Sequence, residues 1–140
     1  MSYLFDRQLE YSVITHIKNV SPTDIPVLDD DLEEELTTSS IVVSCLRKIK
    51  RPFQHGDYEI DRYSWGIYIY ANNKGERDYL TDAVYNSLEP SVKVIDFEDS
   101  DLGNLITQHI TASYLTVPNN GVDKLRYRSF ITFDTIFQEA

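Results

Sequence analysis

The chain has 140 residues, of which 41% are hydrophobic and 26% charged, a composition that is typical of globular domains and excludes a disordered chain. It carries 23 aspartates and glutamates against 13 lysines and arginines, and this formal net charge of −10 disfavours general binding to nucleic-acid phosphates. No apolar run approaches the ~20 residues of a membrane helix. A single cysteine excludes an internal disulfide and a thiolate metal cluster. We expect one domain over residues 1–140, made in a reducing cytoplasm.

The first twenty residues are predicted to form an amphipathic helix. Apolar residues recur every three or four positions, and charged residues occupy the other sides. The helix is expected to end at Ser21, because the residue before Pro22 is pushed out of the α region. We expect this helix to pack on the core, with a contact in an assembly as the alternative. The apolar stripe consists of Phe5, Leu9, Val13, Ile17 and Val20.

Residues 21–40 are acidic, with seven carboxylates and no basic residue. Because neighbouring carboxylates repel each other, we expect a solvated linker over about 21–38, as a short helix or a flexible loop. A calcium-binding loop is disfavoured, because Glu34 stands where the sharp turn of such a loop requires glycine. A negatively charged working surface is the remaining alternative. Its candidate residues are Asp29, Asp30, Asp31, Glu33, Glu34 and Glu35.

A β-branched run over residues 40–46 predicts the first strand. Basic residues follow, and together with Pro52 and Gly56 they indicate a turn or a long loop over about 47–57. This basic cluster is either a solvated strand end or a surface that pairs with acidic residues on another copy or partner. It consists of Arg47, Lys48, Lys50 and Arg51.

A second strand is expected over residues 58–70. In its second half, one side carries Trp65 and two isoleucines, and the other side carries Tyr68 and Tyr70. Because both sides are apolar or aromatic, we expect one side to lie on the core and another element or another subunit to cover the second side.

A helix is expected over residues 76–88, with Arg77 on its polar side. A short strand over 91–97 follows, with Phe97 buried, and a second acidic patch then surrounds a turn at Gly103. The apolar stripe of the helix consists of Leu80, Ala83, Val84, Ser87 and Leu88.

The last third of the chain is predicted to form a long hairpin. Its strands cover 105–117 and 124–137, and the turn between them falls at 118–121, where asparagine and glycine tolerate positive φ. A helix over 101–112 is the alternative, because the apolar residues there also fit a helical period. The expected fold class is α/β of the α+β type, with a single, mostly antiparallel sheet flanked by two main helices.

No catalytic or metal-binding pattern stands out in the sequence. None of the three histidines has a second histidine or a cysteine at ligand spacing. Cys45 has apolar neighbours in a predicted strand, which favours an inert buried thiol over a nucleophile. Glu59 and Asp61 near two lysines match a nuclease metal site weakly, and the net charge disfavours it. We expect no enzymatic activity and no cofactor.

The order of these elements, together with segment 62–71 (RYSWGIYIYA), resembles the tail terminator, or tail completion, proteins of long-tailed bacteriophages. In that family an N-terminal helix precedes two strands, the second of which enters with an arginine and then alternates aromatic and aliphatic residues. A helix like that over 76–88 follows, and the chain closes on a strand like that over 126–137.

The resemblance implies a structural virion protein of the tail or neck, whose small subunits form a homohexameric ring. Such a ring ends the tube of tail-tube protein and joins it to a head connector or stopper protein, and DNA passes through it without specific binding. The strong negative charge suits that passage. We expect the assembly contacts to include Arg47, Lys48, Lys50, Arg51, Tyr68 and Tyr70.

Three other functions stay open. The first is another small neck or head-completion protein of a phage, and the second is an acidic binding module that mimics DNA. A mimic would be a monomer or dimer that binds a basic protein, whereas a terminator would form closed rings. The third is a metal-dependent enzyme, whose activity would be lost on replacing Glu59 and Asp61 with alanine.

Overall fold

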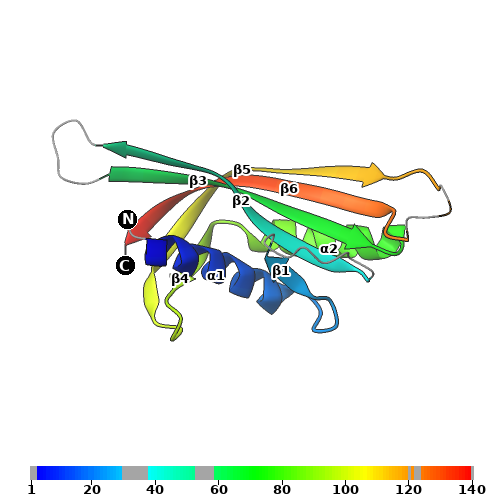
Figure 1. Cartoon of the computed structure of the whole chain (residues 1–140), viewed down its shortest axis with the longest axis horizontal. Helices are drawn as coiled ribbons and strands as arrows, with labels where there is room; N and C mark the ends of the chain where they lie inside the picture. Colours follow the sequence, from blue (N-terminus) through cyan, green and yellow to red (C-terminus); the bar gives the residue numbers. More distant parts are fainter. Residues whose placement is uncertain (1–2, 30–37, 53–58, 120, 122–123, 140) are drawn as a thin grey trace.

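The computed structural model describes residues 3–29, 38–52, 59–119, 121 and 124–139 (Figure 1). In this part of the chain the strands form a six-stranded sheet in the order β1-β2-β3-β6-β5-β4, antiparallel except for the β1–β2 pair. The predicted α+β fold with a mostly antiparallel sheet is therefore confirmed. The elements are α1 (Tyr3–Val20), β1 (Val27–Asp29), β2 (Ser40–Pro52), β3 (Glu59–Ala71), α2 (Lys74–Ser87), β4 (Ser91–Ile95), β5 (Asp101–Thr116) and β6 (Tyr127–Glu139).

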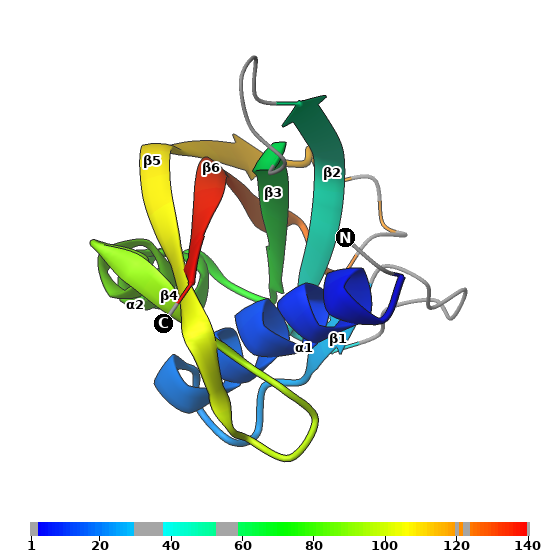
Figure 2. The ribbon, with the colours of Figure 1, turned by 90° about the vertical axis from the view of Figure 1, so that its left-hand side faces the viewer.

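Both helices lie on the same side of the long strands (Figure 1). The sheet is strongly curled, so that β1 and β4, the two ends of the strand order, both contact α1 (Figure 2). Successive side chains of a strand point to opposite sides of a sheet. We call the side that carries the helices the inner face and the opposite side the outer face.

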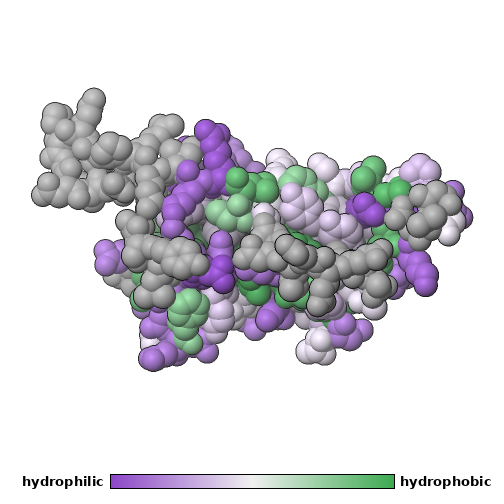
Figure 3. Space-filling model, viewed as in Figure 1, coloured by the Kyte–Doolittle hydropathy of each residue, from purple (hydrophilic) through white to green (hydrophobic). Residues whose placement is uncertain are grey.

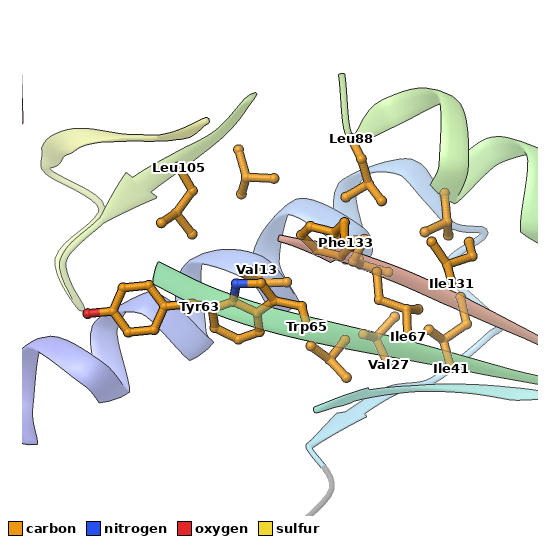
Figure 4. Close-up of a cluster of buried hydrophobic side chains, with 14 of the residues drawn as sticks. Val13, Val27, Ile41, Tyr63, Trp65, Ile67, Leu88, Leu105, Ile131 and Phe133 are labelled. Atoms are coloured by element: carbon orange, nitrogen blue, oxygen red, sulfur yellow. The ribbon is translucent and has the colours of Figure 1, made fainter. Parts of the chain in front are cut away.

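The hydrophobic core lies between the inner face and the helices (Figure 4). The predicted stripe of α1 is buried there through Leu9, Val13 and Ile17. Trp65 of β3 is also buried, and its Nε1 donates a hydrogen bond to Thr135 Oγ1 at 2.9 Å. The polar atom of the indole ring is thus satisfied inside the core. The predicted apolar stripe of the first helix is confirmed, and β3 turns the side that carries Trp65 to the core.

Helix α2 begins at Lys74, two residues before the predicted start. The cause is a cap: Asn73 Oδ1 accepts a hydrogen bond from the Glu76 backbone N–H at 2.8 Å, which satisfies one of the free donors of the first turn. The apolar stripe is confirmed, since Leu80, Val84 and Leu88 are buried and Ala83 and Ser87 are half-buried.

Arg77 was expected on the polar side of this helix, and that prediction is wrong, because the side chain is buried and only 5% exposed. Its Nη1 donates to Thr116 Oγ1 at 3.2 Å, and its Nε donates to Asp78 Oδ1 at 3.0 Å. The guanidinium also lies 5.2 Å from the ring centre of Tyr114 and 5.8 Å from that of Tyr127. These partners replace water around the charge. Except for Asp78, the next residue of α2, they come from β5 and β6, so the helical period could not reveal them.

Two segments that were predicted as linker or loop contain strands. β1 lies inside the predicted acidic linker and pairs in parallel with β2, with Val27 opposite Ile41. β2 continues through the basic cluster, where a turn or loop was expected, because β3 provides a partner along that whole length. A bulge between Cys45 and Arg47 shifts the register of this pair.

The alternative helix over 101–112 is wrong, and the predicted hairpin is confirmed. β5 covers this segment and pairs with β4 on one side and with β6 on the other. Leu105 lies opposite both Val92 and Phe137, so its burial comes from two neighbouring strands. The backbone groups of the segment are thereby satisfied in the sheet, which leaves no reason to form a helix.

The predicted turn at Gly103 is also wrong, because this residue lies within β5. The turn falls at 96–100, where Asp96 Oδ1 accepts hydrogen bonds from the backbone N–H groups of Glu98 at 2.8 Å and Ser100 at 2.9 Å. Phe97, expected to be buried, is 51% exposed, because β4 ends before it at Ile95.

Candidate assembly surface

No helix or strand of the described chain lies over the outer face of the sheet (Figures 1 and 2). The pairing of β2, β3 and β6 places aromatic and basic residues on this face. Tyr68 and Tyr70 lie on this face, as the alternation predicted, and both are half-buried. β6 places Phe130 opposite Tyr68 and Arg128 opposite Tyr70. Along the side formed by the long strands, hydrophobic and strongly hydrophilic patches lie next to each other (Figure 3).

A small aromatic cluster forms the centre of the outer face. Tyr68 and Phe130 stack, with ring centres 4.4 Å apart and an angle of 18° between the rings. A Cβ at Gly66 would lie 2.7 Å from Phe130 Cε2 and 3.0 Å from Leu46 Cδ1. The missing side chain therefore lets Phe130 and Leu46 lie directly over the strand, with Leu46 46% exposed.

A groove of about 260 Å³ opens beside this cluster. Leu115 forms part of it and is 58% exposed. Arg128 stands in the same groove with its guanidinium carbon 5.3 Å from the ring centre of Tyr70. The groove is thus apolar and aromatic with one positive charge. The outer-face residues that line it are Tyr68, Tyr70, Ser113, Leu115, Arg128 and Phe130.

The structure separates the residues of the predicted basic cluster. Arg47 is exposed on the outer face. Lys48, one residue further along the strand, points to the other side and forms an ion pair with Asp6 of α1. The side chains of Lys50 and Arg51 lie outside the described part of the structure. The two residues whose side chains are described therefore have different roles, one toward solvent and one toward the first helix.

Two further arginines, which were not among the contacts expected from the sequence, share the outer face with Arg47. The strand register places Arg62 of β3 and Arg128 of β6 on the outer face. Asp134 lies among them and accepts a hydrogen bond from Ser64 Oγ at 2.7 Å. For Arg128 the sequence did contain an indication. Residues 128 and 130 are two positions apart in β6, so the alternation of the strand places Arg128 on the same side as Phe130. The outer face thus gathers positive charge on a strongly negative chain.

Acidic residues concentrate on other surfaces. Asp82 is exposed on α2, and the turn at 96–100 carries exposed carboxylates. Of the acids proposed for a channel or working surface, Asp29 lies half-buried at the end of β1, opposite Val43. The other candidates, Asp30, Asp31, Glu33, Glu34 and Glu35, lie outside the described residues.

A larger cleft of about 500 Å³ lies between α1 and the bulge of β2. Asp6 and Glu10 line it from the helix, and Cys45 and Lys48 line it from the strand. Burial raises the pKa of the Cys45 thiol to about 11, and the negative charge of Glu10 adds to the effect. The thiol is therefore protonated at neutral pH, in line with the expected inert thiol. Opposite charges already pair across this cleft.

No group of three or more histidines, cysteines, aspartates and glutamates could hold a metal ion among the described residues. His16 Nε2 lies 2.9 Å from the Ser87 carbonyl oxygen and links α1 to the end of α2. The side chains of Glu59 and Asp61, the weak candidates for a metal site, lie outside the described part. In the described chain, no helix is both long enough and apolar enough to span a membrane.

Comparison with solved structures finds the same fold in a chain from the virion of a native gene transfer agent particle. The TM-score is 0.62 and the sequence identity 13%, and the alignment covers 99% of this chain and 100% of that chain. No protein-family model matches the sequence, and no curated protein matches it. The likeness therefore concerns the fold, which extends over both chains almost completely.

Proposed function

We propose that this chain is a structural subunit of a phage-like virion, and that it forms a closed ring that ends the tail tube and joins it to the head connector. The observation that carries the proposal is the fold shared with a virion chain over 99% of this chain and 100% of that one. The finer role rests on the order of elements, which resembles that of tail terminator proteins.

The composition of the outer face supports a role in assembly. Aromatic residues and arginine are enriched at the centres of protein–protein interfaces, where lysine and glutamate are depleted. The groove beside Tyr68 follows this pattern, because neither a lysine nor a glutamate is among the described residues that line it. An aromatic surface that is open in the single chain would be covered in a ring.

The net charge supports the passage of DNA through such a ring. A subunit with a charge of −10 repels phosphates, so that DNA would move through the channel without specific binding. The partners of the ring would be tail-tube protein on one side and a head connector or stopper protein on the other, in the tail or neck of the virion.

A neck or head-completion protein is the second candidate of the same class, and an acidic DNA mimic is the candidate of a different class. The net charge favours a mimic. The outer face opposes it, because a mimic presents carboxylates on its binding surface, whereas this face presents Arg47, Arg62 and Arg128.

The mass in solution tests the proposal, measured by light scattering after size-exclusion chromatography over a range of concentration and salt. We expect a closed oligomer near six subunits, and rings at the ends of tail tubes in electron micrographs when tail-tube protein is added. A monomer or dimer that leaves the tubes open and captures a basic protein would contradict the ring and favour the mimic. Rings that bind the connector but not tail tubes would assign the chain to the neck.

A further inference from the structure

We infer that the subunits of the ring meet head to tail, with the outer-face groove of one copy receiving the exposed stripe of α2 of the next copy. Tyr79 enters the groove, and Asp82 pairs with Arg128. The inference rests on the proposed ring, and it names the two surfaces that would build it.

The first surface is a stripe on α2 that points away from the sheet. Since the buried residues of this helix face the sheet, residues at positions 75, 79, 82 and 86 lie on the opposite side. Tyr79 is 63% exposed, more than any other large hydrophobic residue in the described chain. Asp82, one turn further on, is exposed as well. The stripe therefore presents an aromatic ring beside a carboxylate.

The second surface is the groove, and its chemistry is complementary to the stripe. Its walls are Tyr68, Phe130 and Leu115, which suit an aromatic ring. Arg128 supplies a guanidinium, which forms strong, charge-assisted hydrogen bonds with a carboxylate. An acidic stripe of one copy and a basic groove of another thus attract each other, although the two copies as a whole carry the same negative charge.

Among the described residues, the turn at 96–100 also combines carboxylates with an exposed aromatic ring, but several of its groups already have partners within the chain. The ring of Phe97 lies 5.4 Å from that of Tyr11. Asp99 Oδ1 accepts a hydrogen bond from the Tyr11 hydroxyl at 2.9 Å. Asp101, just after the turn, pairs with Lys93 at 3.6 Å. The stripe on α2 is therefore the better match to the groove.

The positions of the two surfaces favour a repeating contact over a two-fold dimer. Two outer faces placed against each other would bring Arg47, Arg62 and Arg128 of both copies together, and like charges oppose such a contact. The groove lies on the outer face, while the stripe points away from the sheet on the helix side. A contact between different surfaces leaves one of each free, so that it repeats until the ring closes.

Two variants test the inference, each altering one surface. The groove variant is Leu115→Glu with Arg128→Glu, and the stripe variant is Tyr79→Ala with Asp82→Ala, so that the two altered surfaces do not carry opposite charges. The matched control, Phe97→Ala with Glu98→Ala, makes the same change in the turn as the stripe variant makes on α2. Circular dichroism and thermal unfolding check that each variant folds. We expect both surface variants to associate at least about tenfold more weakly than the natural chain, a loss of about 1.4 kcal/mol, and the control to form rings normally.

Mixing the two surface variants gives the decisive result. The groove variant keeps an intact stripe, and the stripe variant keeps an intact groove, so a head-to-tail contact predicts a one-to-one dimer that grows no further. A face-to-face contact predicts instead that the stripe variant assembles alone and that the mixture forms no mixed dimer, which overturns the inference. Rings from both variants separately would place the contact elsewhere and leave the proposed ring intact. If the natural chain stays monomeric at millimolar concentration, with and without tail tubes, this result overturns both the head-to-tail contact and the proposed ring.

Discussion

At the scale of single residues, Gly66 shapes the centre of the outer face, because Phe130 and Leu46 lie against its backbone. A Cβ at this position would meet the edge of the Phe130 ring at 2.7 Å. The ring lies on an open face and can shift, but a shift disturbs its stacking on Tyr68 and the shape of the adjoining groove. Glycine is therefore required here because Phe130 lies so close to the backbone. The backbone conformation does not itself require glycine, since φ is not positive at this residue.

Replacing Gly66 with alanine should lower the free energy of unfolding by about 1 kcal/mol or more, the usual cost of overpacking. Gly75→Ala is the matched control, because it lies in the first turn of α2 and its Cβ would meet its nearest neighbour at 3.5 Å. There the higher helix propensity of alanine should raise the free energy of unfolding by up to ~1 kcal/mol. Urea denaturation followed by circular dichroism measures both. Equal effects of the two substitutions would refute the close contact.

Cys45 should react slowly with alkylating reagents. Its pKa is raised from 9.0 to about 11 by burial, and two units correspond to about a hundredfold less thiolate at neutral pH. The rate of iodoacetamide labelling, compared between the native chain and the chain in guanidinium, tests this. We expect the native rate to be lower by a factor of that order; equal rates would show that the cleft does not protect the thiol.

The same pKa shift makes stability depend on pH in a defined direction. The folded state holds the thiol proton more tightly than the unfolded state, so the thiol's contribution to stability is complete below pH 9 and is lost as the pH rises toward 11. Cys45→Val removes this contribution. The difference in stability between the natural chain and this variant should therefore change in that range and stay constant between pH 6 and 8.

At the scale of elements, the extension of β2 through the basic cluster assigns different functions to adjacent residues. Because a strand alternates, Arg47 faces solvent on the outer face, whereas Lys48 pairs with Asp6 of α1. The ion pair connects α1 to β2 across the cleft. In the loop that the sequence predicted, all four basic residues could have acted as one patch.

Charge reversal at these two positions should have different effects. Lys48→Glu places two carboxylates together and should lower stability by about 0.5–1 kcal/mol, as expected for a half-exposed pair. Adding Asp6→Lys should restore most of this loss. Arg47→Glu should leave stability within ~0.5 kcal/mol and weaken ring formation instead. Chemical denaturation and light scattering measure the two effects, and a ring weakened only by Lys48→Glu would contradict the role of the outer face.

At the scale of the whole molecule, the distribution of charge matters more than its sum. The chain carries a net charge of −10, yet Arg47, Arg62 and Arg128 share the outer face. Carboxylates occupy α2 and the turn at 96–100. Such a subunit has two complementary sides, which gives orientation and specificity to its association.

The net charge should nevertheless prevent binding to DNA. In fluorescence anisotropy with a labelled DNA duplex at 0.15 M salt, we expect a dissociation constant weaker than ~10⁻⁴ M, the weak end of non-specific binding. The groove variant, which lacks Arg128, serves as the control and should behave identically. Micromolar binding that is lost in this variant would assign the outer face to nucleic acid and contradict the free passage of DNA.

The sequence by itself determined the two helices, the alternation of β3 and the final hairpin. Each of these follows from a local period: every third or fourth residue in α1, every second residue in β3 and β6. The same alternation placed Tyr68 and Tyr70 together on the side of β3 opposite Trp65, and the packing of the helices decided which side is the outer one. Such patterns report on neighbours within one turn or two residues, so they need no knowledge of distant partners.

Only the tertiary structure decided where these elements meet. Arg77 is buried because β5 and β6 bring Thr116 and two tyrosine rings to it. These partners are far from Arg77 in the sequence, so the residues around it do not predict its burial. The basic cluster forms part of β2 because β3 provides hydrogen-bond partners for its backbone. The groove needs Tyr68, Leu115 and Arg128 together, from three strands whose register is set by pairing over long separations in the chain. The local period determines on which side of its helix or strand a residue lies. The register of strand pairing determines which residues from other strands lie beside it.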